Sequence, residues 1–148
     1  MQRARKERFK DEVPITDGYT NQTLERDGQS HIEHVISAKE LHDDDWLRLY
    51  LDVDERKDLA NSDNNKTWTN ASLNKSKQDQ DLIKWMETPS TNDETKTNAQ
   101  YYKVDKEQAK ELYSQARRER NKRLYNKVGK EVMVQCERFA EQKEETIH

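Results

Sequence analysis

Cysteine, glycine and proline are scarce in this chain, and each shortage excludes a class of protein. The single cysteine, Cys136, can form no internal disulfide, thiol redox pair or zinc knuckle on its own. Three glycines and two prolines in 148 residues are too few for a turn-rich β-sandwich. No apolar run approaches the roughly 20 residues of a membrane span, and no secretion signal is visible. We therefore expect a cytoplasmic protein without a membrane partner.

Apolar residues are also few, and the charged residues are unevenly distributed. Hydrophobic residues make up 30% of the chain and charged residues 39%, which predicts a small core and a solvated helix or disordered part. Residues 103–130 hold ten Lys or Arg against four Asp or Glu, residues 1–10 are basic, and acidic residues gather at 43–58. Two basic ends around carboxylates suit a polyanionic substrate. Each charge run taken alone is equally typical of a solvated helix face.

The local patterns predict a small α+β fold. β-prone residues at 31–36 and 67–69 predict two short strands, and Ser72 begins a helical pattern that continues to Met86. Between the strands, Trp46, Leu49 and Tyr50 share one face of a helix that Asp43–Asp45 would cap.

The second half of the chain predicts a linker and a long helix. Residues 87–100 are polar and unpatterned, and Asp105 with Gln108 forms the start signal of a helix that Gly129 would bend. The expected organisation is a basic arm, a core domain, a polar linker and a basic helical extension, at residues 1–12, 13–86, 87–100 and 101–148.

The polar residues around the two predicted strands are those of a metal-dependent phosphodiesterase. Glu33 and His34 lie in the first predicted strand, Asn65 precedes the second, and Asn74 lies on the following helix. This pattern resembles the HNH, or ββα-metal, nuclease family. The spacing from Asn65 to Asn74, with lysines just after it, is also similar to the HNH domain of RNA-guided CRISPR nucleases. The resemblance covers about residues 13–86 and implies two short antiparallel strands and a helix around one metal. Together with the local patterns, it leads us to expect an α+β fold with a small HNH-like core, additional helices and a long C-terminal helical extension.

The resemblance implies a role for each of these residues. His34 would be the general base, and Asn65 would hold the loop that orients it. Glu33 and Asn74 would hold one divalent ion, for which oxygen ligands favour Mg²⁺ or Mn²⁺ over zinc. Basic residues on the closing helix and the extension would contact the nucleic acid: Lys75, Lys77, Arg117, Arg118 and Arg120.

Several alternatives stay open at this point. Asn61 and Asn64 are alternatives to Asn65, and His31 is either an outer ligand or a solvated residue. Adjacent strand residues point to opposite faces, so Glu33 and His34 share a site only where the strand ends or bulges.

The expected function is endonuclease activity on DNA, with RNA as an alternative substrate, in a bacterial or phage-infected cell. The other readings are an inactive nucleic-acid-binding module and a scaffold whose C-terminal helix docks a protein partner.

Overall fold

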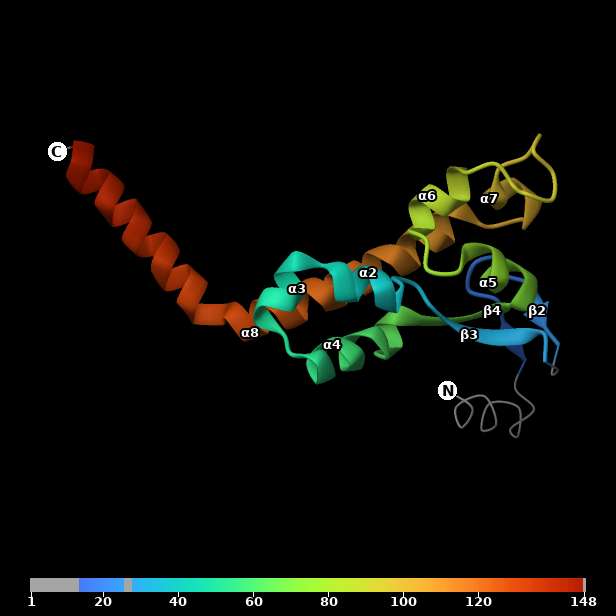
Figure 1. Ribbon diagram of the computed structural model, residues 1–148, viewed down its shortest axis with the longest axis horizontal. Helices are drawn as coiled ribbons and strands as arrows, with labels where there is room; N and C mark the ends of the chain where they lie inside the picture. The colour runs from blue at the N-terminus through green and yellow to red at the C-terminus, as the bar shows by residue number, and fades with distance from the viewer. Residues whose placement is uncertain (1–13, 26–27, 148) are drawn as a thin grey trace.

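The computed structural model describes residues 14–25 and 28–147, with the side chains of the last 18 of these only in part. The basic arm expected at residues 1–12 lies outside the described residues. The chain is an α+β protein with a long C-terminal helix, as the sequence predicted, and its strands form two small antiparallel sheets where one pair of strands was expected (Figure 1). Within the described ranges, no helix is both long and apolar enough to cross a membrane.

The larger sheet pairs β3 (Ser30–His34) with β4 (Lys66–Asn70), in a register that places Ser30 opposite Asn70 and His34 opposite Lys66. The smaller sheet pairs β1 (Ile15–Thr16) with β2 (Thr23–Leu24). Asp17, in the loop between β1 and β2, joins the two sheets.

The Asp17 carboxylate is completely buried and accepts hydrogen bonds from the Thr69 hydroxyl and from the backbone and side-chain amides of Asn70, each at 3.0 Å. These bonds fix the end of β4, where the next helix begins.

Three short helices and a 3₁₀ turn connect β3 to β4: α2 (Ala38–Asp43), α3 (Asp45–Tyr50), α4 (Val53–Ala60) and η1 (Asp63–Asn65). Each α-helix begins at a side chain that caps its free backbone amides, and these caps are Ser37, Asp44 and Asp52.

The buried face of α3 is not the one that the sequence predicted. Leu47 is completely buried, whereas the side chains of Trp46 and Leu49 are 60% and 69% exposed. The Trp46 ring instead stacks on Tyr50 at the surface, with 6.2 Å between ring centroids. Because α3 packs on the long C-terminal helix, the partner helix rather than the local spacing selects the buried face.

The helix expected after Ser72 is divided in two. Asn70 caps α5 (Ala71–Lys77), and Gln78 ends it with a φ of 48°, in the left-handed region that few side chains adopt. A separate helix, α6 (Leu82–Glu87), begins at Asp81.

Residues 87–100 are folded rather than a linker. Pro89 pairs with Thr97 in a short bridge, and Thr97 caps α7 (Asn98–Tyr101). Ser90, Asn98 and Ala99 are buried, and the Asn98 side chain donates to the Trp85 carbonyl at 2.9 Å.

The long helix α8 (Lys106–Ile147) begins where Asp105 accepts from the amide of Gln108, as predicted, and kinks at Gly129 with a φ of 36°. Beyond the kink it projects away from the rest of the molecule (Figure 1). Its first half packs on η1, α3, α4 and α6. One hydrophobic core runs from Tyr19 to Ala116, so the predicted boundaries near residues 87 and 100 do not separate independent cores.

Candidate functional site

The site begins where β3 ends. His34 is the last residue of the strand, and the next amide, of Val35, donates to the carbonyl of Asn65 at 2.8 Å. The Asn65 side chain is 1% exposed, accepts from the Ile36 amide at 2.8 Å, and donates to the carbonyls of Ile36 and Ala60 at 3.0 Å. Its carboxamide therefore holds the chain immediately after His34, at the position that the sequence assigned to it.

Asn61 contacts His34 directly. The Nε2 atom of His34 lies 3.0 Å from Oδ1 of Asn61. An amide oxygen accepts but cannot donate, so Nε2 carries a hydrogen in this arrangement, and in the neutral ring Nδ1 is the nitrogen with the lone pair. The sequence considered Asn61 only as a substitute for Asn65, whereas the structure gives the two asparagines different contacts.

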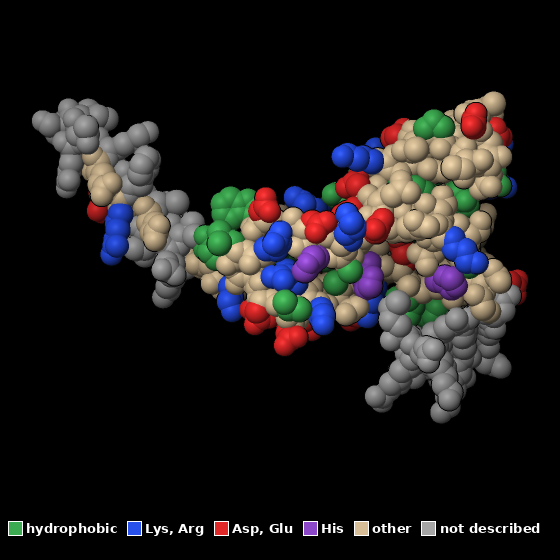
Figure 2. Space-filling model, viewed as in Figure 1, with side chains coloured by type: hydrophobic (Ala, Val, Ile, Leu, Met, Phe, Trp, Pro, Cys, Tyr) green, Lys and Arg blue, Asp and Glu red, His purple; other side chains and the backbone are tan. Residues whose placement is uncertain are grey.

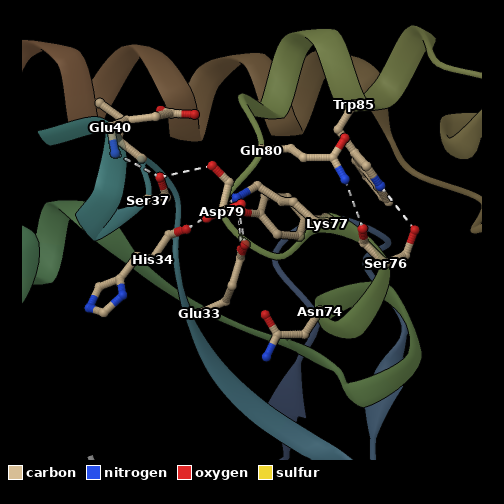
Figure 3. A network of polar contacts seen from close by, with 12 residues as sticks. Glu33, His34, Ser37, Glu40, Asn74, Ser76, Lys77, Asp79, Gln80 and Trp85 are labelled. Atoms are coloured by element: carbon tan, nitrogen blue, oxygen red, sulfur yellow. Dashed lines mark hydrogen bonds and ion pairs between the residues drawn. The ribbon is translucent and has the colours of Figure 1, made fainter. Parts of the chain in front are cut away.

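Glu33 lies on the opposite side of the strand from the His34 ring, as the alternation of strand side chains requires (Figure 3). It is 5% exposed. Oε1 lies 2.7 Å from Nζ of Lys77, and Oε2 accepts from the Tyr19 hydroxyl. Burial raises the pKa of Glu33, while the positive charge of Lys77 and the Tyr19 hydrogen bond act in the opposite direction. Burial and the charge of Glu33 raise the Tyr19 pKa well above its ordinary value.

Asn74 comes to the same place from α5. Its Nδ2 donates to Nδ1 of His31 at 3.1 Å, which leaves the amide oxygen for another partner. Asn74 and Lys77 are three residues apart on α5, so they share a helix face and both meet β3. Figure 3 shows the Asn74 side chain extending from α5 toward Glu33.

The side chains assigned to the site line one cleft of about 400 Å³. Glu33, His34 and Asn74 all line it, although Glu33 and His34 leave the strand on opposite faces. They share the cleft because β3 ends at His34, which was the condition that the sequence set. The remaining lining residues come from β3, from the turn before α2 and α2 itself, and from the turn after α5: Ile32, Ser37, Ala38, Lys39, Gln78 and Asp79.

The predicted DNA-contacting residues are not at this cleft. Lys77 is completely buried against Glu33 instead of facing solvent, while its neighbour Lys75 is exposed. On α8, Arg118 pairs with Glu111 at 3.1 Å, and Arg117 is exposed on the helix surface.

Arg120 is bound within the protein. Its guanidinium nitrogens Nε and Nη2 lie 3.0 Å and 2.8 Å from Oδ2 of Asp44. The Arg120 side chain is only 12% exposed. Because this pairing orients the guanidinium toward α3, Arg120 holds α8 on that helix.

The donor atoms of the cleft fit a hard divalent ion with few protein ligands. No group of three His, Cys, Asp or Glu side chains within the described part of the chain is arranged to hold a metal. The carboxylate of Glu33 and the carboxamide of Asn74 supply oxygen atoms of the kind that bind such an ion. Mg²⁺ is commonly held by one or two protein oxygens together with waters and substrate phosphates. The ammonium of Lys77 already faces Oε1, so an ion there shares or displaces that contact.

Four contacts of this site were missing from the sequence interpretation: the bonds of Tyr19 and Lys77 to Glu33, of His31 to Asn74, and of Asn61 to His34. Only the contact of Lys77 had a signal in the sequence, because Lys77 lies one helical turn after Asn74 and so shares its helix face. No protein-family model matches the chain, and no match is found among curated proteins or solved structures.

Proposed function

We propose that the chain is a metal-dependent endonuclease of the HNH type that hydrolyses phosphodiester bonds in DNA at this cleft. The observation that supports it is the convergence of Glu33, His34 and Asn74 on one cleft, from the end of β3 and from α5. A second support is the chain order of β3, its antiparallel partner β4 and α5, since the resemblance implies two antiparallel strands followed by a helix.

In this proposal His34 takes the proton of the attacking water. Its Nδ1 is available for that proton because Asn61 holds Nε2. Asn65 fixes the loop that follows His34, and so limits the directions that the ring adopts.

Glu33 and Asn74 would hold the Mg²⁺ or Mn²⁺ ion. When bound, the ion supplies charge stabilisation at the phosphate and at the leaving oxygen. The two protein ligands leave most of the coordination shell to water and phosphate oxygens, which is the usual arrangement for Mg²⁺.

The test is cleavage of supercoiled plasmid in Mg²⁺, Mn²⁺ or EDTA. Wild-type protein should nick the plasmid in either metal and not in EDTA. The His34→Ala variant should lose about 10²- to 10⁴-fold in rate, because a general base contributes that much. Added imidazole should restore part of this activity, which it would not do for a merely misfolded variant. A folded His34→Ala protein that cuts at the wild-type rate would remove His34 from the mechanism.

A second candidate is a nucleic-acid-binding module without catalysis. The Lys77 ammonium supports this candidate, because it neutralises the carboxylate that the ion would need. A plasmid that shifts in the gel but stays supercoiled in both metals would favour it over the endonuclease.

A further inference from the structure

A second groove adjoins the cleft and opens between α2 and α4. It encloses about 400 Å³ and shares His34, Ala38 and Lys39 with the cleft. The remaining lining residues come from the two helices and from Asn61, just after α4: Leu41, His42, Val53, Arg56, Lys57, Ala60 and Asn61. A ligand that passes His34 therefore meets this groove next.

Every ionisable side chain that lines the groove is basic or a histidine. The lining contains Lys39, Arg56 and Lys57 together with His34 and His42, and no Asp or Glu. Figure 2 shows histidine and basic side chains on the face that carries α2 and α4, with acidic side chains above and below them. The apolar part of the lining consists of the buried Leu41 and Ala60 and the exposed Ala38 and Val53. Cationic side chains beside apolar ones match the phosphates and the sugar faces of a nucleic-acid backbone.

The acidic residues of α4 face elsewhere. Asp54, Glu55 and Asp58 line a different groove, of about 600 Å³, against the basic residues of α8. Lys127 pairs with Glu55 at 3.1 Å, and Arg123 pairs with Asp58. α4 therefore separates its charges, because Glu55 and Asp58 pair with α8 while Arg56 and Lys57 line the groove beside His34.

The contacts of the groove cations show which of them are held by the protein and which can bind a ligand. Arg56 donates through Nη1 to the Leu51 carbonyl at 2.6 Å, which fixes its guanidinium. Lys39 pairs with Asp43 at 3.3 Å, and both side chains are more than half exposed. An exposed ion pair contributes little to stability, so Lys39 can leave Asp43 to bind a phosphate. Lys57 is exposed.

We propose that this groove binds the sugar-phosphate backbone of the DNA strand beside the phosphate at His34. The proposal rests on the proposed endonuclease function, because that function places a phosphate of the strand at His34 and so sets the path of the strand into the groove. It assigns DNA contacts to Lys39 and Lys57, in place of Lys77 and Arg120, whose charges the protein neutralises internally.

The test measures binding of a fluorescently labelled DNA duplex in EDTA, over a range of salt concentrations. The groove variant is Lys39→Gln/Lys57→Gln. The matched control is Lys84→Gln/Lys110→Gln, which removes the same charge from exposed positions on α6 and α8. Two lost phosphate contacts should lower the salt slope by about 2 and the affinity roughly 30-fold at 0.15 M salt. The control should bind as the wild type does.

Equal losses in both variants would overturn the proposal, because net charge alone would then explain the binding. Wild-type DNA affinity in the groove variant would also overturn it. So would a loss of affinity for single-stranded RNA without a loss of affinity for the DNA duplex. Binding in EDTA requires no cleavage, so a wild-type protein that binds through the groove and fails to cut plasmid would contradict only the proposed function.

Discussion

The ammonium of Lys77 lies 2.7 Å from Oε1 of Glu33, and both side chains are buried. This ion pair joins α5 to the end of β3, the two elements that form the cleft. Removal of one partner from a buried pair leaves an uncompensated charge away from water, which costs far more than the intact pair contributes.

Lys77→Met should therefore destabilise the protein by about 3–5 kcal/mol, even though methionine fills a similar volume. Urea unfolding followed by circular dichroism measures this loss. Lys75→Met is the matched control, since Lys75 is exposed on the same helix and should change stability by no more than about 0.5 kcal/mol. Equal effects of the two substitutions would show that the ion pair does not hold α5 on β3.

The same substitution should increase the affinity for Mn²⁺. Without Lys77, the carboxylate of Glu33 loses the cation that competes for Oε1. Calorimetric titration of the folded Lys77→Met protein with Mn²⁺ should show tighter binding than in the wild type, and Glu33→Gln/Lys77→Met should lose the gain. If both variants bind Mn²⁺ as the wild type does, Glu33 is not a ligand.

Among the asparagines of the connection between β3 and β4, Asn65 should cost the most stability when it is replaced by alanine. Asn65→Ala leaves one buried amide and two buried carbonyls without their partner, at about 1–3 kcal/mol for each unsatisfied group, so we expect a loss of roughly 3 kcal/mol or more. Asn64→Ala removes one exposed bond to Glu119 and should cost less than about 1 kcal/mol. Thermal unfolding of the two variants makes the comparison. Similar melting temperatures would mean that the loop after His34 is held by other contacts.

His31 should position Asn74 through a single hydrogen bond. His31→Asn keeps an acceptor near the place of Nδ1, whereas His31→Leu has a similar size and no acceptor. Loss of a residue that orients a metal ligand typically costs 10- to 100-fold in metal affinity, so His31→Leu should weaken Mn²⁺ binding by roughly that factor. His31→Asn should retain most of it. Equal affinities in the two variants would assign His31 a packing role only.

Glu40 should make the protein less stable as the pH rises. Burial raises the pKa of Glu40 to about 7, and the negative charge of Asp81 adds to this effect. The folded state then holds a proton that the unfolded state releases near pH 4.5, so stability falls from about that pH to about 7 and then levels off.

Glu40→Gln should therefore stabilise the protein at pH 8 relative to pH 5, by roughly 1–2 kcal/mol after allowance for solvent screening. Urea unfolding at the two pH values measures the difference, with Glu94→Gln on an exposed turn as the control. A gain that is the same at both pH values would assign the effect to packing rather than to ionisation.

The sequence alone determined the features that depend on neighbours within one turn. The Asp105 cap, the strand at β4 and the kink at Gly129 all follow from local backbone chemistry, and the structure has each of them. The loop contact of Asn65 after His34 is one that the resemblance implied, and the Asn65 side chain accepts a hydrogen bond from the Ile36 amide there.

Only the tertiary structure decided which faces are buried and which charges remain for a ligand. The local pattern predicted a buried Trp46, but Trp46 is exposed and Leu47 joins the core, because α3 packs between its neighbours α2 and α8. Lys77 is buried by Glu33, from a strand far away in the chain, and the acids of α4 are neutralised by α8. A residue's type and spacing fix its local conformation, but the energy of a charge depends on which distant groups remove it from water and pair with it.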